Sequence, residues 1–139
     1  MNTDETRIND WDVACHPKKL IHREITEVII GAAYEVHSVL GAGFLEKVYQ
    51  RSLQAEIIRR GLRAEIERAL PVTYKGIIVG EYFADLVAEE KVIVELKVSP
   101  ELNRNDEAQL LNELKAIGMQ VGLLINFGRT RVEFLRRVI

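Results

Sequence analysis

The chain has little cysteine and histidine, no long hydrophobic run and no excess of basic residues. Its 139 residues include one Cys, three His and one Trp, with a net charge of -2 and a pI near 6.0. The single thiol, Cys15, excludes an intramolecular disulfide and a multi-cysteine metal cluster, which agrees with a reducing compartment. The longest apolar stretches, 28–34 and 121–125, are far too short to cross a membrane.

The charge balance excludes a domain that binds nucleic acid through its overall charge. Such domains have a pI above about 9, so any contact with nucleic acid must be local here. Basic residues gather in three short groups, at 18–23, 59–63 and 129–137, and a solvated surface of mixed charge explains each group at least as well. The first residues are polar and acidic and lack the pattern of a signal peptide, so we expect a cytoplasmic protein without a membrane segment.

The length suits one domain that buries roughly two thirds of its unfolded surface in a single core. Residues 1–19 show no sustained hydrophobic period, and we expect them to form an arm or tail. Residues 20–139 are expected to form the folded domain. Helical spacing of apolar residues predicts helices over 20–40 and 44–60, each followed by glycine.

Short segments rich in β-branched and aromatic residues predict five strands, with one more helix between the third and the fourth. The element order is ααβββαββ, which indicates an α/β or α+β sheet with flanking helices. The last strand alternates apolar and charged residues, so it is a candidate edge for pairing with a second copy in a homodimer. The strands are expected over 62–74, 77–88, 92–98, 121–127 and 131–139, and the helix over 103–117.

Two of the predicted strands carry charge where a plain core strand would not. Asp85 lies in the second strand, and Glu95 and Lys97 lie in the third. Side chains alternate along a strand, so Glu95 and Lys97 project from the same face. Buried charges are costly to desolvate unless they are paired or bind a metal. The set is therefore a candidate site for Mg²⁺ or Mn²⁺, with the two carboxylates as ligands; a structural ion pair between Lys97 and one acid is the alternative.

The segment Gly43–Tyr49 reads Gly-x-x-Glu-x-x-Tyr. It resembles the signature of the bacterial and archaeal GxxExxY proteins, a family assigned to the PD-(D/E)xK nuclease superfamily. The resemblance covers about residues 20–139. It implies a restriction-endonuclease-like mixed sheet flanked by helices, and a metal-dependent nuclease that acts on nucleic acid, with DNA favoured over RNA. Four further segments resemble the same family: 36–41, 74–85, 94–97 and 122–128.

The resemblance also implies roles for individual residues. The metal would be held by Asp85 and Glu95, with Lys97 as the catalytic lysine. In one branch of the superfamily an acid on an early helix and a Gln on the helix after the lysine strand join the site, and these match Glu46 and Gln109. A second hypothesis is a non-catalytic module that keeps the nuclease fold and binds nucleic acid or a protein partner.

His37 and Tyr49 are auxiliary candidates for the same site. Imidazole binds metals and shuttles protons, while a His near a helix end more commonly packs against the last carbonyls. Tyr49 lies on an apolar helix face, and a core residue with a hydrogen-bonded hydroxyl is the simpler interpretation. One departure from the family is Glu113, which stands where related sequences tend to have Tyr four residues after Gln109.

Overall fold

The structure is a computed structural model that describes residues 21–139, so the arm predicted over 1–19 lies outside the described residues. The element order ααβββαββ is confirmed. None of the helices described there has the length and hydrophobicity to span a lipid bilayer. The elements are α2 (Arg23–Leu40), α3 (Glu46–Arg59), β1 (Ala64–Tyr74), β2 (Ile77–Ala88), β3 (Val92–Lys97), α4 (Arg104–Ile117), β4 (Val121–Asn126) and β5 (Glu133–Val138).

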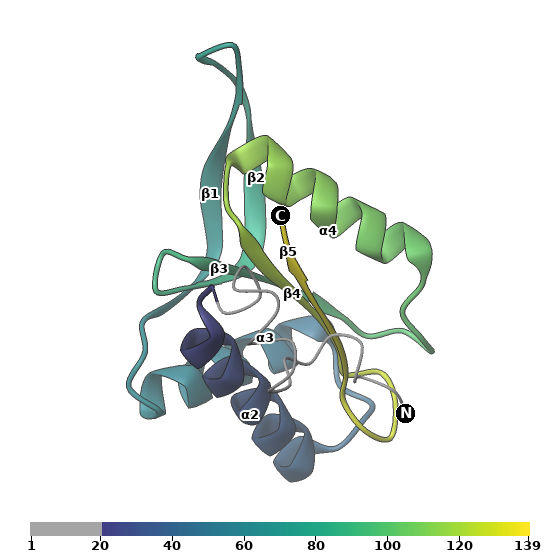
Figure 1. Ribbon diagram of the computed structural model, residues 1–139. Coiled ribbons are helices and arrows are strands. Elements are labelled where there is room, and N and C mark those ends of the chain that lie inside the picture. The colour runs from purple at the N-terminus through teal and green to yellow at the C-terminus, as the bar shows by residue number, and fades with distance from the viewer. Residues whose placement is uncertain (1–20) are drawn as a thin grey trace, which may run out of the picture.

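The five strands form one mixed sheet in the order β1-β2-β3-β4-β5 (Figure 1). Strands β3 and β4 run parallel and are joined by the crossover helix α4, as parallel neighbours require. The other neighbouring pairs are antiparallel. A mixed sheet with flanking helices was the sequence prediction, and the structure confirms it.

Helices cover both faces of the sheet, with α2 and α3 on one face and α4 on the other (Figure 1). Strand β4 lies between both layers, so all its residues are buried. Gly122 in β4 lets α4 approach closely, because a Cβ there would lie 2.9 Å from a Leu110 methyl group. The α4 layer is the smaller core, and its buried residues are Ala84, Val87, Ile93, Leu110, Leu114 and Leu124.

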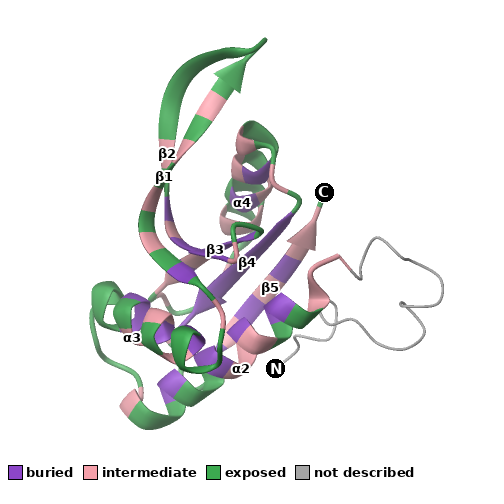
Figure 2. Ribbon diagram, turned by 90° about the vertical axis from the view of Figure 1, so that its left-hand side faces the viewer, coloured by how far each residue is buried: buried purple, intermediate pink, exposed green. Residues whose placement is uncertain are grey.

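Strands β1 and β2 form a long hairpin that projects from the body of the molecule (Figure 1). The two strands pair from their turn down to Ala64 and Ala88. Strand β3, however, pairs with β2 only over Leu86–Ala88. Most of the hairpin beyond that point is exposed (Figure 2). The hairpin continues through Pro71 without a break, since an edge strand accommodates a residue that lacks an N–H.

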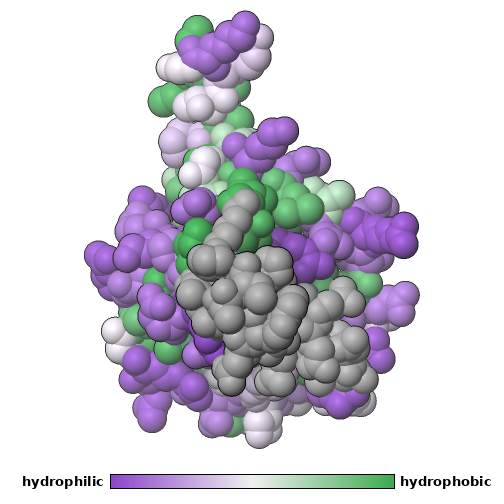
Figure 3. All heavy atoms as spheres, viewed as in Figure 1, coloured by the Kyte–Doolittle hydropathy of each residue, from purple (hydrophilic) through white to green (hydrophobic). Residues whose placement is uncertain are grey.

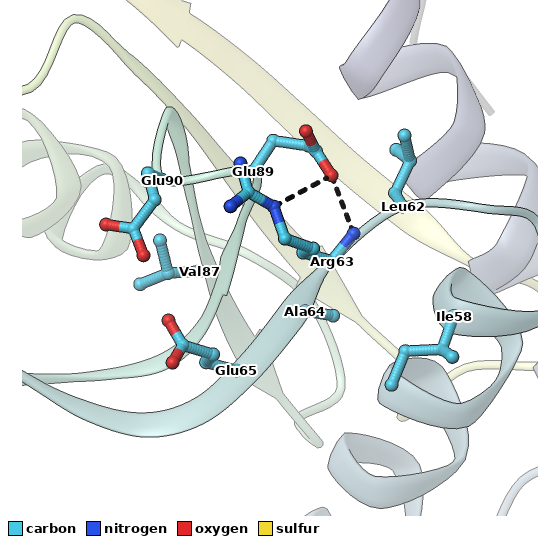
Figure 4. A pocket seen from close by; sticks show the side chains of 8 residues that line it. All are labelled: Ile58, Leu62, Arg63, Ala64, Glu65, Val87, Glu89 and Glu90. Atoms are coloured by element: carbon cyan, nitrogen blue, oxygen red, sulfur yellow. Dashed lines mark hydrogen bonds and ion pairs between the residues drawn. The ribbon is translucent and has the colours of Figure 1, made fainter.

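The two turns that flank β2 differ in sequence. Both place two residues at positive φ, as a type I′ hairpin turn requires: Lys75 (48°) with Gly76 (83°), and Glu89 (55°) with Glu90 (59°). The second turn has no glycine, and Figure 4 shows a contact that holds it: Glu89 accepts the main-chain N–H of Arg63 at 2.7 Å and faces its guanidinium. The turn borders a hollow of about 410 Å³, lined by Ile58, Leu62, Arg63, Ala64, Glu65, Val87, Glu89 and Glu90.

Candidate active site

Strands β2 and β3 separate next to Asp85, and this fork is the centre of the candidate site. Main-chain pairing between the strands ends at Leu86 and Val94. One step further, Oδ2 of Asp85 accepts the N–H of Leu96 at 2.8 Å, in the place of a main-chain ladder bond. Gln50 of α3 donates to the Asp85 carbonyl at 2.8 Å. The side chain of Asp85 is therefore held by the Leu96 N–H, which has no main-chain partner on β2 because β2 separates from β3 at this point.

Glu95 of β3 lies beside Asp85 in the fork. Its Oε2 accepts a hydrogen bond from the Tyr82 hydroxyl and lies 3.4 Å from the Asp85 nitrogen. Burial, followed by the negative charge of Asp85, raises the pKa of Glu95 to about 8. The pKa of Tyr82 is also raised, by burial and then by the charge of Glu95. Two acids this close in a partly buried site disfavour a second negative charge.

Tyr82 extends the fork toward α4. Its hydroxyl lies 2.8 Å from Oε1 of Glu113, while Oε2 of Glu113 accepts from the Gln109 side chain at 3.2 Å. A hydroxyl has one proton, so Tyr82 donates to only one of the two carboxyl groups at a time. Glu95, Tyr82, Glu113 and Gln109 thus form one connected chain from β3 to the helix.

Lys97 projects beside the fork and remains partly free. Its Nζ lies 3.9 Å from Oδ1 of Asp106, at the limit of an ion pair, and its side chain is 35% exposed. The other oxygen of Asp106 accepts the N–H of Asn103 and caps α4. Within residues 21–139, Lys97 has no ion pair with Asp85 or Glu95. The predicted alternative, a structural pair with one of those acids, is not what the structure shows.

The Gly43–Tyr49 segment fixes the loop between α2 and α3. Tyr49 is fully buried, and its hydroxyl donates to the Gly41 carbonyl at 2.6 Å and accepts the Phe44 N–H at 3.3 Å. Gly43 has a φ of 107°, which favours glycine. Helix α3 consequently begins at Glu46, two residues later than the sequence predicted, because the loop is pinned to the Tyr49 hydroxyl.

Glu46 and Gln109 approach the fork from the two helical layers. The pKa of Glu46 is raised by partial burial and by the charge of Asp85, while Lys97 opposes the shift, so both groups lie within electrostatic reach. Gln109 is exposed on α4 and lines the same small hollow as Glu95 and Lys97. The structure therefore gathers all five principal candidates around one place on the sheet.

His37 makes its contacts elsewhere. Its Nε2 lies 2.8 Å from the Arg129 carbonyl oxygen, in the connection between β4 and β5. Its ring stacks near those of Tyr49 and Phe127, with centroids 6.5 Å and 6.2 Å away. Among the contacts of the described residues, none joins His37 or Tyr49 to the acids or the lysine of the fork. Both residues instead hold main-chain segments in place.

The donor set of the fork suits a hard divalent cation. Within residues 21–139, no three acidic, histidine or cysteine side chains already converge as a metal-binding group. Leu96 and Tyr82 each engage one oxygen, of Asp85 and Glu95 respectively. Two adjacent, partly buried carboxylates with no cation paired to them are nevertheless the ligands that Mg²⁺ or Mn²⁺ prefers.

Three contributors to the fork were missed by the sequence analysis: Tyr82, Gln50 and Asp106. A signal existed for Asp106, which lies three residues after Asn103 as a capping box requires. Glu113 was noticed only as a departure, although its place one turn after Gln109 puts both on one helix face. No local pattern marks Tyr82 or Gln50, because their partners are distant in sequence.

Comparison with known proteins identifies the family to which the chain belongs. The sequence model of one protein family, described as the PD-(D/E)XK nuclease superfamily, matches residues 23–138. A solved structure described as the crystal structure of SSO0001 is 18% identical and aligns over 99% of this chain and 70% of that chain, with a TM-score of 0.48. A search of curated proteins finds no match.

Proposed function

Because the chain belongs to the PD-(D/E)XK nuclease superfamily, we propose that it is a metal-dependent nuclease that hydrolyses phosphodiester bonds of nucleic acid, with DNA favoured over RNA. The observation that carries this proposal is the fork, where Asp85 and Glu95 lie side by side at the point where two strands part, and Lys97 lines the same small hollow as Glu95. The Gly43–Tyr49 signature supports a narrower assignment to the GxxExxY group.

Asp85 and Glu95 would hold the metal, Mg²⁺ or Mn²⁺. When bound, such an ion activates water and stabilises charge on the phosphoryl oxygens. Asp85 is rigid because the Leu96 N–H fixes Oδ2, which leaves Oδ1 for a cation. Glu95 is held through Tyr82, and burial followed by the charge of Asp85 raises its pKa, which a bound cation would oppose.

Lys97 would act as the electrostatic catalyst. Its loose, partly exposed pairing with Asp106 leaves the ammonium able to turn toward a phosphoryl oxygen or an attacking water. Glu46 would serve as an auxiliary acid from the α3 side. Gln109, tied to Glu113, would position substrate or water from the α4 side.

A non-catalytic module that binds nucleic acid or a protein partner is the alternative. Such a module gains nothing from two adjacent, partly buried acids, since their desolvation and mutual repulsion destabilise the fold. The fork therefore favours the enzyme. A fork that has lost catalytic function would bind metal weakly, so a measurement of metal binding separates the two hypotheses before any substrate is known.

The test is a cleavage assay on labelled single-stranded DNA, duplex DNA and RNA with Mg²⁺, Mn²⁺ or EDTA. We expect metal-dependent cutting that Lys97→Ala abolishes and that Lys115→Ala, an exposed lysine in the last turn of α4, leaves intact. Titration calorimetry with Mn²⁺ should show binding that Asp85→Asn removes. Cutting that persists in EDTA, or Mn²⁺ binding that Asp85→Asn leaves unchanged, would contradict the proposal.

A further inference from the structure

The outer part of the β1–β2 hairpin, residues 68–84, has no neighbouring strand and is called the arm below. Pairing with β3 stops at Leu86, so the strands of the arm pair only with each other. Figures 1 and 3 show the arm standing clear of the body as a narrow column. An isolated two-stranded ribbon is at best marginally stable in water, unless another surface packs against it. A binding partner that packs against the arm would therefore stabilise it.

The strand register divides the side chains of the arm between two faces. Leu70 and Tyr82 are directly opposite each other and pack against the core beneath α4. Residues one step along each strand point the other way. That outer face is apolar except for one acid and one hydroxyl, and it carries Ala69, Pro71, Thr73, Ile78, Glu81 and Phe83.

The apolar surface of the arm is large for a single chain. Five large apolar side chains of the arm are each at least 60% exposed, with Ile78 and Phe83 on the outer face and Tyr74 and Ile77 paired with each other next to the turn. Exposed apolar patches on soluble proteins often mark a binding surface. The five residues are Tyr74 (60%), Ile77 (65%), Ile78 (67%), Val79 (60%) and Phe83 (60%).

The charges of the arm argue against nucleic acid as its partner. Phosphate contacts need several Lys or Arg side chains, whereas the outer half of the arm has only Lys75, whose Nζ lies 5.4 Å from the centroid of the Tyr74 ring. Glu81 adds a negative charge to the outer face. Within residues 21–139, neither Lys75 nor Glu81 forms an ion pair, so each is available to an opposite charge outside this chain.

We propose that the arm is a homodimerisation surface, in which the arms of two copies pack antiparallel across a two-fold axis. Such packing covers the outer face of each arm, where Ile78 and Phe83 are the large exposed apolar side chains. The antiparallel packing also brings Lys75, at the turn of each arm, toward Glu81 on the outer face of the other arm. The two opposite charges make the surface complementary to itself.

The opposite edge of the sheet is less suited to this role. Strand β5 was predicted as an edge and is one, but its buried Arg136 is tied to Thr26 Oγ1 of α2 at 3.2 Å and to the Ile21 carbonyl, just before that helix, at 2.5 Å. The arm also leads directly into the fork, because Asp85 follows its last residue. A dimer formed through the arms would join two forks, one for each strand of a duplex.

The test is the molar mass of the full chain by size-exclusion chromatography with light scattering over a range of concentrations. We expect twice the monomer mass of 15.9 kDa for the wild type. Ile78→Glu and Phe83→Glu should give monomers with an unchanged circular dichroism spectrum. The matched control is Val39→Glu on α2, a side chain that is 71% exposed and should leave the dimer intact.

A charge exchange tests the pairing without disturbing the apolar face. Lys75→Glu should weaken the dimer at least several-fold, and adding Glu81→Lys should restore it. A wild type that stays monomeric at every concentration, or a dimer that survives Ile78→Glu, would overturn the proposal. The proposal would also be overturned by a monomer that binds duplex DNA and loses that binding in Ile78→Glu, since the arm would then be a nucleic-acid-binding surface.

Discussion

The two halves of β2 share one backbone conformation and have opposite surroundings. Residues Leu86–Ala88 pair with strands on both sides and are buried, whereas 77–83 pair on one side and are mostly exposed. Asp85 lies where the halves meet. The buried half supplies rigidity, and the departing half frees the Leu96 N–H and the space that a carboxylate needs. A strand that leaves its sheet thus creates a rigid polar site inside an apolar fold.

The largest effect should come from truncating the buried half. Leu86→Ala removes a fully buried side chain and leaves a cavity, so we expect a loss of about 2–5 kcal/mol in the free energy of unfolding. Ile78→Ala in the exposed half should lower it by less than about 1 kcal/mol when the chain is monomeric. Urea unfolding at low protein concentration measures both. Equal losses would show that the two halves are packed alike.

The next effect concerns the ionisation of Glu95 in the fork. The folded-state pKa of Glu95 is about 8, against 4.5 for a free side chain. Between these values the folded state binds more protons than the unfolded state, so metal-free stability should fall as pH rises from 4.5 to 8. Glu95→Gln should abolish this fall and be more stable than the wild type at pH 8, by an amount on the order of a few kcal/mol.

Thermal unfolding in EDTA across this pH range measures the effect, and Glu101→Gln is an exposed control. The two proteins should be alike near pH 5, where Glu95 is protonated in the folded chain. The same Glu95→Gln variant should lose Mn²⁺ binding, which would show that the group destabilises the fold because it serves the site. Parallel pH profiles for variant and wild type would refute the burial argument.

A smaller effect should follow from the tyrosine that spans the fork. Tyr82→Phe keeps the ring but removes the hydroxyl that bridges Glu95 and Glu113. We expect a loss of about 1 kcal/mol in stability and Mn²⁺ affinity weaker by about 10-fold, as for the loss of other groups that orient a metal ligand. Calorimetry measures the affinity. Tyr74→Phe in the exposed half is the control and should change neither quantity.

The smallest effect should come from the turns at the two ends of β2. Glu90→Gly relieves a positive φ of 59° and removes an exposed ion pair with Arg68 that contributes little, so it should raise Tm by a few degrees. Glu89→Gly should give no such gain, because it also removes the acceptor for the Arg63 N–H. At the other end, Gly76→Ala, at a φ of 83°, should lower Tm. Scanning calorimetry measures Tm for the three variants. A higher Tm for Gly76→Ala than for Glu90→Gly would contradict this prediction.

The element order and the main candidates were readable from the sequence because their signals are local. Apolar periodicity located the helices and strands, and alternation placed Glu95 and Lys97 on one face of β3. The mixed sheet and the superfamily followed from a resemblance, and the family comparison confirmed the superfamily. The Gly43–Tyr49 motif pointed to Glu46 as a candidate. The sequence did not explain why the motif has Gly and Tyr, which the hydrogen bonds of the Tyr49 hydroxyl and the positive φ of Gly43 do.

Other features depended on residues far apart in the chain. The contact of Tyr82 with Glu113 spans 31 positions, and that of Gln50 with the Asp85 carbonyl spans 35. The first strand continues through Pro71, because β1 lies at the edge of the sheet and the missing N–H of proline breaks no hydrogen bond to a neighbouring strand. No window of sequence contains the information that settles such cases.

The sequence by itself determined which segments become helices and strands, since hydrophobic period and turn residues act within a few positions. It also placed acids and a lysine in neighbouring strands. Only the tertiary structure decided that β2 leaves β3 at Asp85, that Lys97 pairs loosely with Asp106, and that an apolar arm stands in solvent. Strand register and helix packing set these outcomes, and both arise from contacts made only when the whole sheet has formed.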